Sequence, residues 1–132
     1  MKTITRLQYF TQENLLFTYE EQVKLVSSYG CDCVHLKITN SNEEAYLKIA
    51  QKCIKIAHEN NSKLIVWDYP EVAKKVHADG IHFTKWNSSD LKNFNTLKEE
   101  FLLGCSVNAL DDVIGLKHEF DYLFLGPYEN RN

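Results

Sequence analysis

The residues best suited to chemistry in this sequence stand where short apolar runs end. Asp68 directly follows the run Leu64–Trp67, whose non-alternating apolar composition predicts a strand buried on both faces of a parallel sheet. In parallel α/β folds, ligands meet the groups at the carboxyl ends of strands. Asp68 is therefore a candidate ligand-binding carboxylate. Its alternative role is to cap the helix that begins near Pro70.

Polar side chains also alternate along the predicted strand Cys33–Ile38. His35, Lys37 and Thr39 share one face, because successive side chains of a strand point to opposite sides. We expect an anion, from the protein or from a ligand, next to Lys37, because a buried ammonium without a partner is costly. His35 has the simpler alternative of a hydrogen-bonded structural residue.

The cysteines offer a weaker candidate for chemistry. Cys31 and Cys33 would share a face of the same predicted strand, which in principle suits a soft metal. No second pair of Cys or His stands at zinc spacing. We therefore interpret all four cysteines as buried reduced thiols: Cys31, Cys33, Cys53 and Cys105.

Alternating strands and helices would position these residues. Short apolar runs predict strands at Leu7–Phe10, Cys33–Ile38, Leu64–Trp67, Ile81–Phe83, Leu102–Ser106 and Tyr122–Leu125. Residues that favour helix starts lie between these runs: Thr18, Ser41 or Asn42, Pro70, Ser88 or Ser89, and Asn108. Gly30 is expected to end the first helix, and Gly80 to turn the chain into the fourth strand.

The short connections between these segments require right-handed crossovers and a parallel sheet. Two α/β architectures fit this order: parallel (β/α) repeats that form a partial TIM barrel of about six strands, and an open doubly wound sheet. A complete eight-stranded barrel needs roughly 200 residues or more, so a barrel of this length would lack its last two strands. Its first and last strands would be unpaired edges, and we expect further residues or a second copy of the chain to cover them.

The bulk composition predicts a single domain over residues 1–132. The chain has 132 residues, of which 44% are hydrophobic, and a net charge of −3. That charge gives no reason to expect nucleic acid or a membrane surface as a partner. Because an incomplete barrel has unpaired edge strands, we expect a homo-oligomer. The sequence contains no apolar run long enough to span a membrane and no signal peptide pattern, so we expect a cytoplasmic location.

Five strand ends carry a specific pattern, and the most specific is Ala78–Phe83, which is Ala-Asp-Gly-Ile-His-Phe. The other four are Val34–Thr39, Leu64–Asp68, Leu103–Ser106 and Asp121–Pro127. In this order and spacing they resemble the thiamine-phosphate synthase and TenI (thiazole tautomerase) family of (β/α)₈ barrels, whose third motif is Ala-Asp-Gly-Val-His-Leu. The resemblance covers nearly the whole chain.

The resemblance implies a protein of thiamine biosynthesis. The synthase of this family joins a pyrimidine methyl diphosphate to a thiazole phosphate and releases diphosphate with the help of Mg²⁺. Position by position, the resemblance assigns diphosphate binding to His35, Lys37, Thr39 and Ser106, and metal binding to Asp68 and Asn87. It also implies phosphorylated pyrimidine and thiazole compounds as ligands, and a structural role for His82 at the end of its strand.

Several of these positions depart from the family pattern. Lys37 and Thr39 replace an Arg and a Lys, and an ammonium lacks the bidentate fork of a guanidinium. Asn87 replaces the second magnesium carboxylate, and Trp67 replaces the Asn before the first. The tautomerase branch uses a proton-shuttling His where this chain has Asn108, and an amide cannot act as a general base near neutral pH.

Two functions follow as alternatives. The first is that of the synthase or the tautomerase, with the activity of this chain alone left open because the metal and base positions have changed. The second is a non-catalytic module that binds a phosphorylated ligand or a protein partner.

Overall fold

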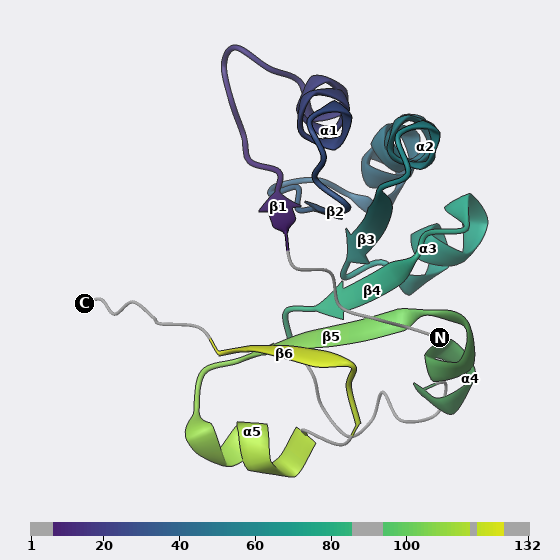
Figure 1. Ribbon diagram of the computed structural model, residues 1–132. Helices are drawn as coiled ribbons and strands as arrows, with labels where there is room; N and C mark the ends of the chain where they lie inside the picture. Colours follow the sequence, from purple (N-terminus) through teal and green to yellow (C-terminus); the bar gives the residue numbers. More distant parts are fainter. Residues whose placement is uncertain (1–6, 86–93, 117–118, 126–132) are drawn as a thin grey trace. The chain divides into compact units, whose positions relative to one another are not determined.

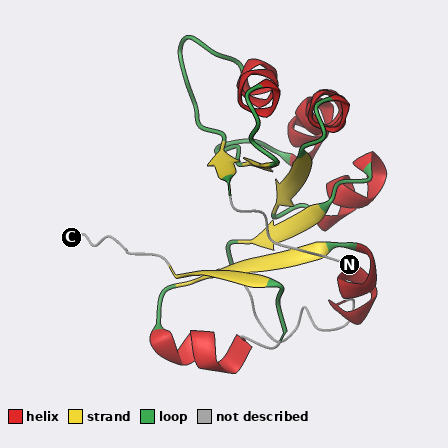
Figure 2. Cartoon of the chain, viewed as in Figure 1, coloured by secondary structure: helices red, strands yellow, loops and turns green. Residues whose placement is uncertain are grey.

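The computed structural model describes residues 7–85, 94–116 and 119–125. The chain forms two compact units: an N-terminal unit of residues 5–81 and a C-terminal unit that begins at His82. In both units, helices alternate with strands along the chain (Figure 2).

The N-terminal unit has a small parallel sheet. Its elements are β1 (Gln8–Phe10), α1 (Tyr19–Ser28), β2 (Cys33–Leu36), α2 (Glu43–Glu59), β3 (Lys63–Trp67) and α3 (Pro70–Val76), followed by the start of β4 (Gly80–Phe83). Tyr9 pairs with Val34, and Val34 with Leu64, so β2 lies between β1 and β3. Helices α1 and α2 pack side by side (Figure 1). The core between sheet and helices is apolar, and its fully buried members include Val34, Leu64, Val66, Ala50 and Ala57.

The predicted helix ends of this unit are largely confirmed. Thr18 accepts a hydrogen bond from the Glu21 N–H, and the Glu21 side chain accepts one from the Thr18 N–H, which completes a capping box. Asn42, one of the two predicted residues, caps α2. Gly30 follows α1 with φ of +101°, the region in which glycine has no steric penalty.

Strand β2 is shorter than predicted, and the cause is Thr11. The strand ends at Leu36 rather than Ile38. The Lys37 N–H donates to Thr11 Oγ1 at 2.8 Å, and the Thr11 hydroxyl donates to the Lys37 carbonyl at 2.9 Å. Because Thr11 takes both backbone groups of Lys37, the ladder cannot continue, and Lys37 and Thr39 lie in the loop that leads to α2.

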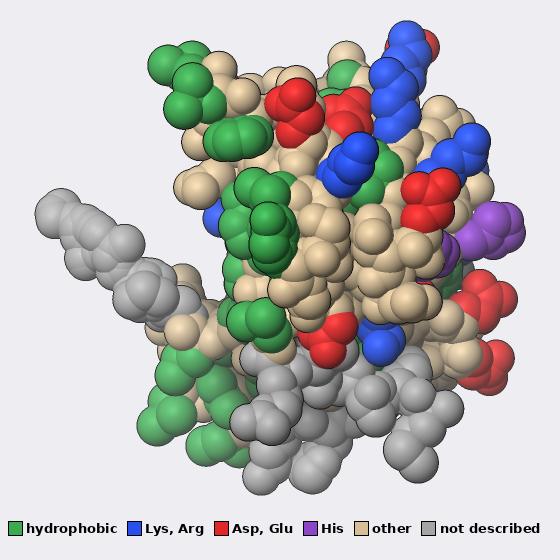
Figure 3. Space-filling model, turned by 45° about the horizontal axis from the view of Figure 1, so that its top comes forward, with side chains coloured by type: hydrophobic (Ala, Val, Ile, Leu, Met, Phe, Trp, Pro, Cys, Tyr) green, Lys and Arg blue, Asp and Glu red, His purple; other side chains and the backbone are tan. Residues whose placement is uncertain are grey.

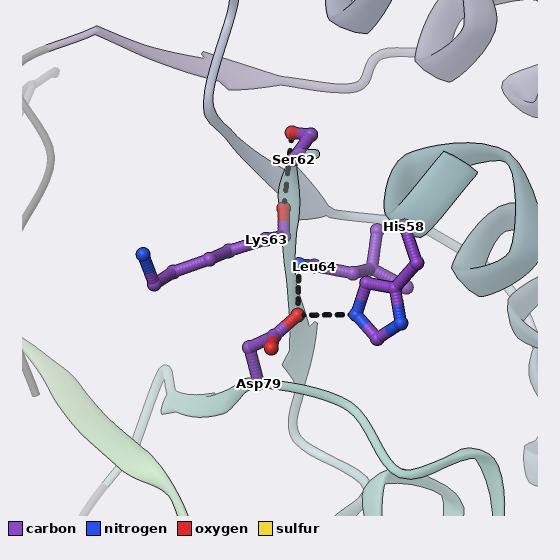
Figure 4. Close-up of polar contacts among 5 residues, drawn as sticks. All are labelled: His58, Ser62, Lys63, Leu64 and Asp79. Atoms are coloured by element: carbon purple, nitrogen blue, oxygen red, sulfur yellow. Dashed lines mark hydrogen bonds and ion pairs between the residues drawn. The ribbon is translucent and has the colours of Figure 1, made fainter. Parts of the chain in front are cut away.

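The turn before β4 also differs from the prediction. Gly80 lies within β4, and the left-handed residue that ends α3 is His77, with φ of +58°. The chain is then held by Asp79. Its backbone N–H donates to the Leu64 carbonyl at 3.0 Å, and its carboxylate accepts the Leu64 N–H at 2.8 Å. His58 Nε2 lies 2.8 Å from the same carboxylate oxygen, whereas the Lys63 side chain extends away from it (Figure 4).

The C-terminal unit repeats this use of an aspartate. Its elements are α4 (Phe94–Glu100), β5 (Leu102–Val107), α5 (Leu110–Leu116) and β6 (Tyr122–Leu125), with β5 and β6 parallel. Asp121 donates its N–H to the Leu103 carbonyl and accepts the Leu103 N–H on its carboxylate, both at 2.8 Å. We call this arrangement an aspartate brace. It explains why Asp79 and Asp121 each stand one residue before a strand.

An aromatic cluster around Phe120 lies in the C-terminal unit. Phe120 packs against Phe83 and Phe94 with ring centres 6.4 and 5.3 Å apart. Helix α5 buries no residue. It begins at Leu110, where the Asp112 N–H donates to the Ala109 carbonyl, rather than directly after Asn108. The predicted helix-capping residues Ser88 and Ser89 lie outside the described residues.

Loss of an aspartate brace should destabilise the protein. Asp79→Ala leaves the buried Leu64 N–H without its acceptor and removes the contact with His58, so we expect the free energy of unfolding to fall by about 2 kcal/mol. Glu71→Ala is the matched control, because it removes only an exposed ion pair with Lys74 and should cost less than about 0.5 kcal/mol. Urea denaturation of both variants measures this difference, and equal losses would contradict the role of the brace.

Exposed hydrophobic side chains gather over the segment between β1 and α1, at the upper left of Figure 3. Leu15 and Leu16 are 103% and 83% exposed, and Phe17 and Leu25 are also exposed. Among the described helices, none is long and apolar enough to cross a membrane.

Candidate functional site

Tyr46 fixes the carboxyl ends of β2 and β3. Its hydroxyl donates to the Leu36 carbonyl and accepts the Trp67 N–H at 2.9 Å, and the side chain is 1% exposed. Burial raises the pKa of the Tyr46 hydroxyl well above its usual range, so it stays a donor. The sequence interpretation missed this residue. Its position four residues before Ala50 on the buried stripe of α2 is the signal that could have found it.

His35 on β2 is enclosed by the aromatic rings of Phe10 and Trp67. The Trp67 Nε1–H donates to His35 Nδ1 at 2.9 Å, and Gln8 Oε1 lies 2.6 Å from His35 Nε2. The ring of Phe10 stacks on the imidazole with centres 4.4 Å apart. Because an indole can only donate, Nδ1 must be the acceptor and Nε2 must carry the proton. His35 is fully buried, and burial lowers its pKa to about 4.

Both ring nitrogens of His35 are therefore engaged within the protein. As placed, His35 presents no group to a diphosphate, and its geometry fits the alternative interpretation of a structural residue. Its effect on a ligand would act through Trp67, whose indole it orients.

Lys37 is an exposed cation at this end of the sheet. Its Nζ lies 5.2 Å from the centre of the Trp67 ring, a cation–π contact. Within the part of the chain that the structure describes, Lys37 forms no ion pair, so the expected protein anion is replaced by an aromatic face. Trp67 thus supports the ammonium of Lys37 through the face of its ring.

Asp68 follows Trp67 with an unusual backbone. Its φ of +68° is left-handed, a region that Asp and Asn adopt more readily than most residues, and its side chain is exposed. The residue that caps α3 is Tyr69, and it makes no side-chain capping bond. Asp68 is therefore not the N-cap residue itself, and its side chain is exposed directly after β3.

Thr39 lines an open cleft. The cleft has a volume of about 570 Å³ and lies between the segments 12–20 and 38–42 and the first turns of α2. Thr39 is exposed, so its hydroxyl is accessible from this cleft.

The C-terminal unit holds the remaining predicted phosphate ligand, Ser106. Ser106 lies on β5 and is partly exposed, and its Oγ is 2.7 Å from His82 Nε2. His82 Nδ1 lies 3.2 Å from the Tyr122 hydroxyl, and His82 has no exposed surface. The structural role expected for His82 thus includes direct contact with a candidate ligand-binding hydroxyl. Tyr122 was not predicted to take part.

The described residues offer few metal ligands. Asn87 lies outside them, and in residues 7–85, 94–116 and 119–125 no group of three His, Cys, Asp or Glu side chains could hold a metal ion. All four cysteines are buried and form no disulfide, and burial raises the pKa of the Cys53 thiol to about 12. Of the two predicted metal ligands, Asp68 lies within the described residues, and its side chain is exposed.

Comparison with known proteins supplies the context for these residues. The sequence model of a family described as thiamine monophosphate synthase matches residues 5–131. Thiamine-phosphate synthases from Phocaeicola vulgatus and Bacteroides thetaiotaomicron are 26% and 28% identical to the chain, over 96% and 92% of its length. A third, from Lactococcus lactis subsp. cremoris, is 37% identical over 61% of the chain.

A solved structure shows the same fold. Thiamine phosphate pyrophosphorylase from Pyrococcus furiosus superposes with a TM-score of 0.77 over 92% of this chain, at 21% sequence identity. With its parallel strands alternating with helices, the chain has the fold of a partial TIM barrel, which confirms that prediction over the open doubly wound sheet. The chain spans 61% and 59% of the first two relatives and 59% of the solved structure.

Proposed function

Because the chain belongs to the thiamine monophosphate synthase family, we propose that it takes part in joining a pyrimidine methyl diphosphate to a thiazole phosphate, with release of diphosphate. The family match over residues 5–131 carries this proposal, since it includes every residue proposed to bind phosphate or metal. A cytoplasmic location, a single domain and association between copies remain predictions that accompany it. The exposed apolar side chains between β1 and α1 support the last of these.

The chemical problem of this reaction is the charge that develops on the departing diphosphate. A cation fixed at that position stabilises the transition state more than the ground state. Lys37 is suited to this task, because Trp67 holds its ammonium in place without neutralising it. Thr39 and Ser106 are each proposed to bind phosphate oxygens through a hydroxyl. His35 contributes by orienting Trp67.

The proposed magnesium ligands of this chain are one carboxylate, Asp68, and one amide, Asn87. Mg²⁺ usually keeps several waters and is bound through one or two carboxylates together with substrate phosphate oxygens. Asp68 can provide one carboxylate, and its left-handed backbone places that carboxylate at the surface beside Trp67. Asn87 is the second proposed ligand and would contribute a neutral oxygen. When bound, the ion would neutralise charge on the diphosphate.

Binding of inorganic pyrophosphate tests the cation directly. We expect Lys37→Met to weaken binding about tenfold by calorimetry, equivalent to about 1.4 kcal/mol, because the variant keeps an apolar side chain over Trp67 and loses the charge. Lys74→Met is the matched control, since Lys74 is an exposed helical lysine paired with Glu71, and it should bind like the parent. Equal affinities of the two variants would contradict the role of Lys37.

The metal has its own test. Asp68→Asn preserves the size of the side chain and tolerates a φ of +68°, so it removes charge with little effect on the backbone. We expect pyrophosphate binding by the parent chain to strengthen when MgCl₂ is added, and this increase to disappear in Asp68→Asn. An increase that survives in the variant would exclude Asp68 as a magnesium ligand.

The second candidate is a module that binds phosphorylated ligands without catalysis. It is favoured by Asn87 and Asn108, which stand where the family has a magnesium carboxylate and the tautomerase base. Formation of thiamine phosphate from both substrates with Mg²⁺ would exclude it. Pyrophosphate binding without any product would favour it, and no binding at millimolar pyrophosphate would overturn both candidates. Because Asn108 replaces the tautomerase base, we do not expect tautomerase activity.

A further inference from the structure

Three side chains form a hydrogen-bonded chain through the C-terminal unit. The Tyr122 hydroxyl lies 3.2 Å from His82 Nδ1, and His82 Nε2 lies 2.7 Å from Ser106 Oγ. Aromatic rings surround the buried imidazole, with the ring centre of Tyr122 at 5.7 Å and that of Phe124 at 4.9 Å. Of these three side chains, Ser106 is partly exposed and can contact a ligand.

The position of one proton decides what Ser106 offers to that ligand. A neutral imidazole donates from one nitrogen and accepts at the other. With the proton on Nδ1, Ser106 must donate to Nε2, and its oxygen presents lone pairs, as in a serine activated as a nucleophile. With the proton on Nε2, the ring donates to Ser106 Oγ, and the serine proton is directed outward as a donor.

We infer that the second arrangement is the native one, with Tyr122 as a positioning residue that acts through His82 to make Ser106 an outward hydrogen-bond donor to a phosphate oxygen. In this arrangement the Tyr122 hydroxyl donates to Nδ1, and each bond of the chain polarises the next. A neutral ring suits the full burial of His82, because an unpaired buried charge is costly. The inference rests on the proposed function, because only a serine whose proton points outward can donate to a phosphate oxygen.

Packing keeps the Tyr122 hydroxyl in place. Tyr122 pairs with Gly104 across the two strands, and its ring lies so close to Gly104 that a Cβ at that position would overlap it. The absence of a side chain at Gly104 thus allows the ring to lie flat over β5, from where its hydroxyl meets His82. This arrangement uses residues from β4, β5 and β6.

Nitrogen-15 NMR of the imidazole side chains tests the inference without any ligand. We expect the full chain to show a neutral His82 protonated on Nε2, and Tyr122→Phe to shift it toward the Nδ1 tautomer, because the donor to Nδ1 is lost. Tyr9→Phe is the control, since its hydroxyl donates to Gln22 in the other unit, and it should leave the His82 signals unchanged. A parent chain with Nδ1 protonated, or with both nitrogens protonated, would overturn the inference.

Titration with inorganic phosphate separates this inference from the proposed function. We expect Ser106→Ala and Tyr122→Phe each to weaken phosphate binding by about fivefold or more, and Tyr9→Phe to have no effect. Tyr122→Phe that binds like the parent while Ser106→Ala does not would overturn the role of Tyr122. Failure of phosphate to bind the parent chain would count against the proposed function, whereas the tautomer found by NMR would still decide the hydrogen-bond direction.

Discussion

Gly104→Ala is expected to lower the free energy of unfolding by about 3 kcal/mol. A Cβ at this position would overlap the Tyr122 ring, and the strand pairing of Gly104 with Tyr122 leaves neither backbone free to move. Such overpacking typically costs 1–3 kcal/mol, and displacement of the ring would also break its hydrogen bond to His82. The loss is a large part of the total stability expected of a domain of this size. Urea denaturation measures it.

A double-mutant cycle identifies the cause of this loss. Tyr122→Leu removes the ring, so Gly104→Ala added to that variant should cost less than about 1 kcal/mol. Gly115→Ala is the control for glycine replacement, because a Cβ at Gly115 would meet no atom within 4 Å. A loss of equal size with and without the Tyr122 ring would show that the backbone of Gly104, rather than its contact with Tyr122, sets the cost.

The cycle also bears on the proposed phosphate site. If Tyr122 is displaced in Gly104→Ala, the bond to His82 is lost as in Tyr122→Phe, although the hydroxyl is still present. Both variants should then show the same change in the His82 tautomer. Strand β5 therefore carries two linked requirements. Gly104 leaves room for the Tyr122 ring, and Ser106 contacts the histidine that this ring positions.

Most of the secondary structure could be predicted from the sequence, because capping residues and apolar runs act on the residues next to them. Thr18, Asn42 and Gly30 act on helix ends within a few residues of themselves, and the predictions at these positions are confirmed. The apolar run of β3 is similarly self-contained. Family resemblance then decided between a barrel and an open sheet, which periodicity alone could not.

The predictions that needed correction depend on contacts between distant segments. Strand β2 ends early because Thr11, 26 residues away in sequence, takes the backbone groups of Lys37. His77 rather than Gly80 turns the chain, because the aspartate brace to Leu64 fixes where β4 begins. No pattern around Lys37 or Gly80 contains this information.

The candidate site residues also divide into those found from local sequence and those whose roles depend on distant contacts. Types and spacing identified Lys37 and Asp68 as polar groups near strand ends, and the family resemblance added Ser106. The structure corrects the expected burial of Lys37, whose side chain is exposed. What these groups can do depends on Trp67, Tyr46 and Tyr122, whose roles follow from hydrogen bonds and ring contacts made across the fold. Trp67 counted as a departure from the family in the sequence, and in the structure it supports the exposed ammonium of Lys37.

The stability of the protein should fall as the pH is lowered from 7 to 5, and His35 should account for about 2 kcal/mol of that loss. Its pKa is about 4 in the folded chain and near 6.5 when unfolded. Between these values the unfolded chain binds a proton that the folded chain excludes, so acid favours unfolding. The contribution of His35 is complete above about pH 7 and is lost progressively as the pH falls toward 4.

His35→Gln should remove this dependence. A glutamine amide can accept the Trp67 Nε1–H and still donate toward Gln8, so the variant keeps the hydrogen bonds without a titrating group. We expect its stability to change about 2 kcal/mol less than that of the parent chain between pH 7 and 5, by urea denaturation at each pH. His77→Asn, at an exposed position with a left-handed φ, should keep the parent's slope. If His35→Gln also kept that slope, His35 would have to accept a proton in the folded state, and Trp67 would then lack the acceptor that orients it beneath Lys37.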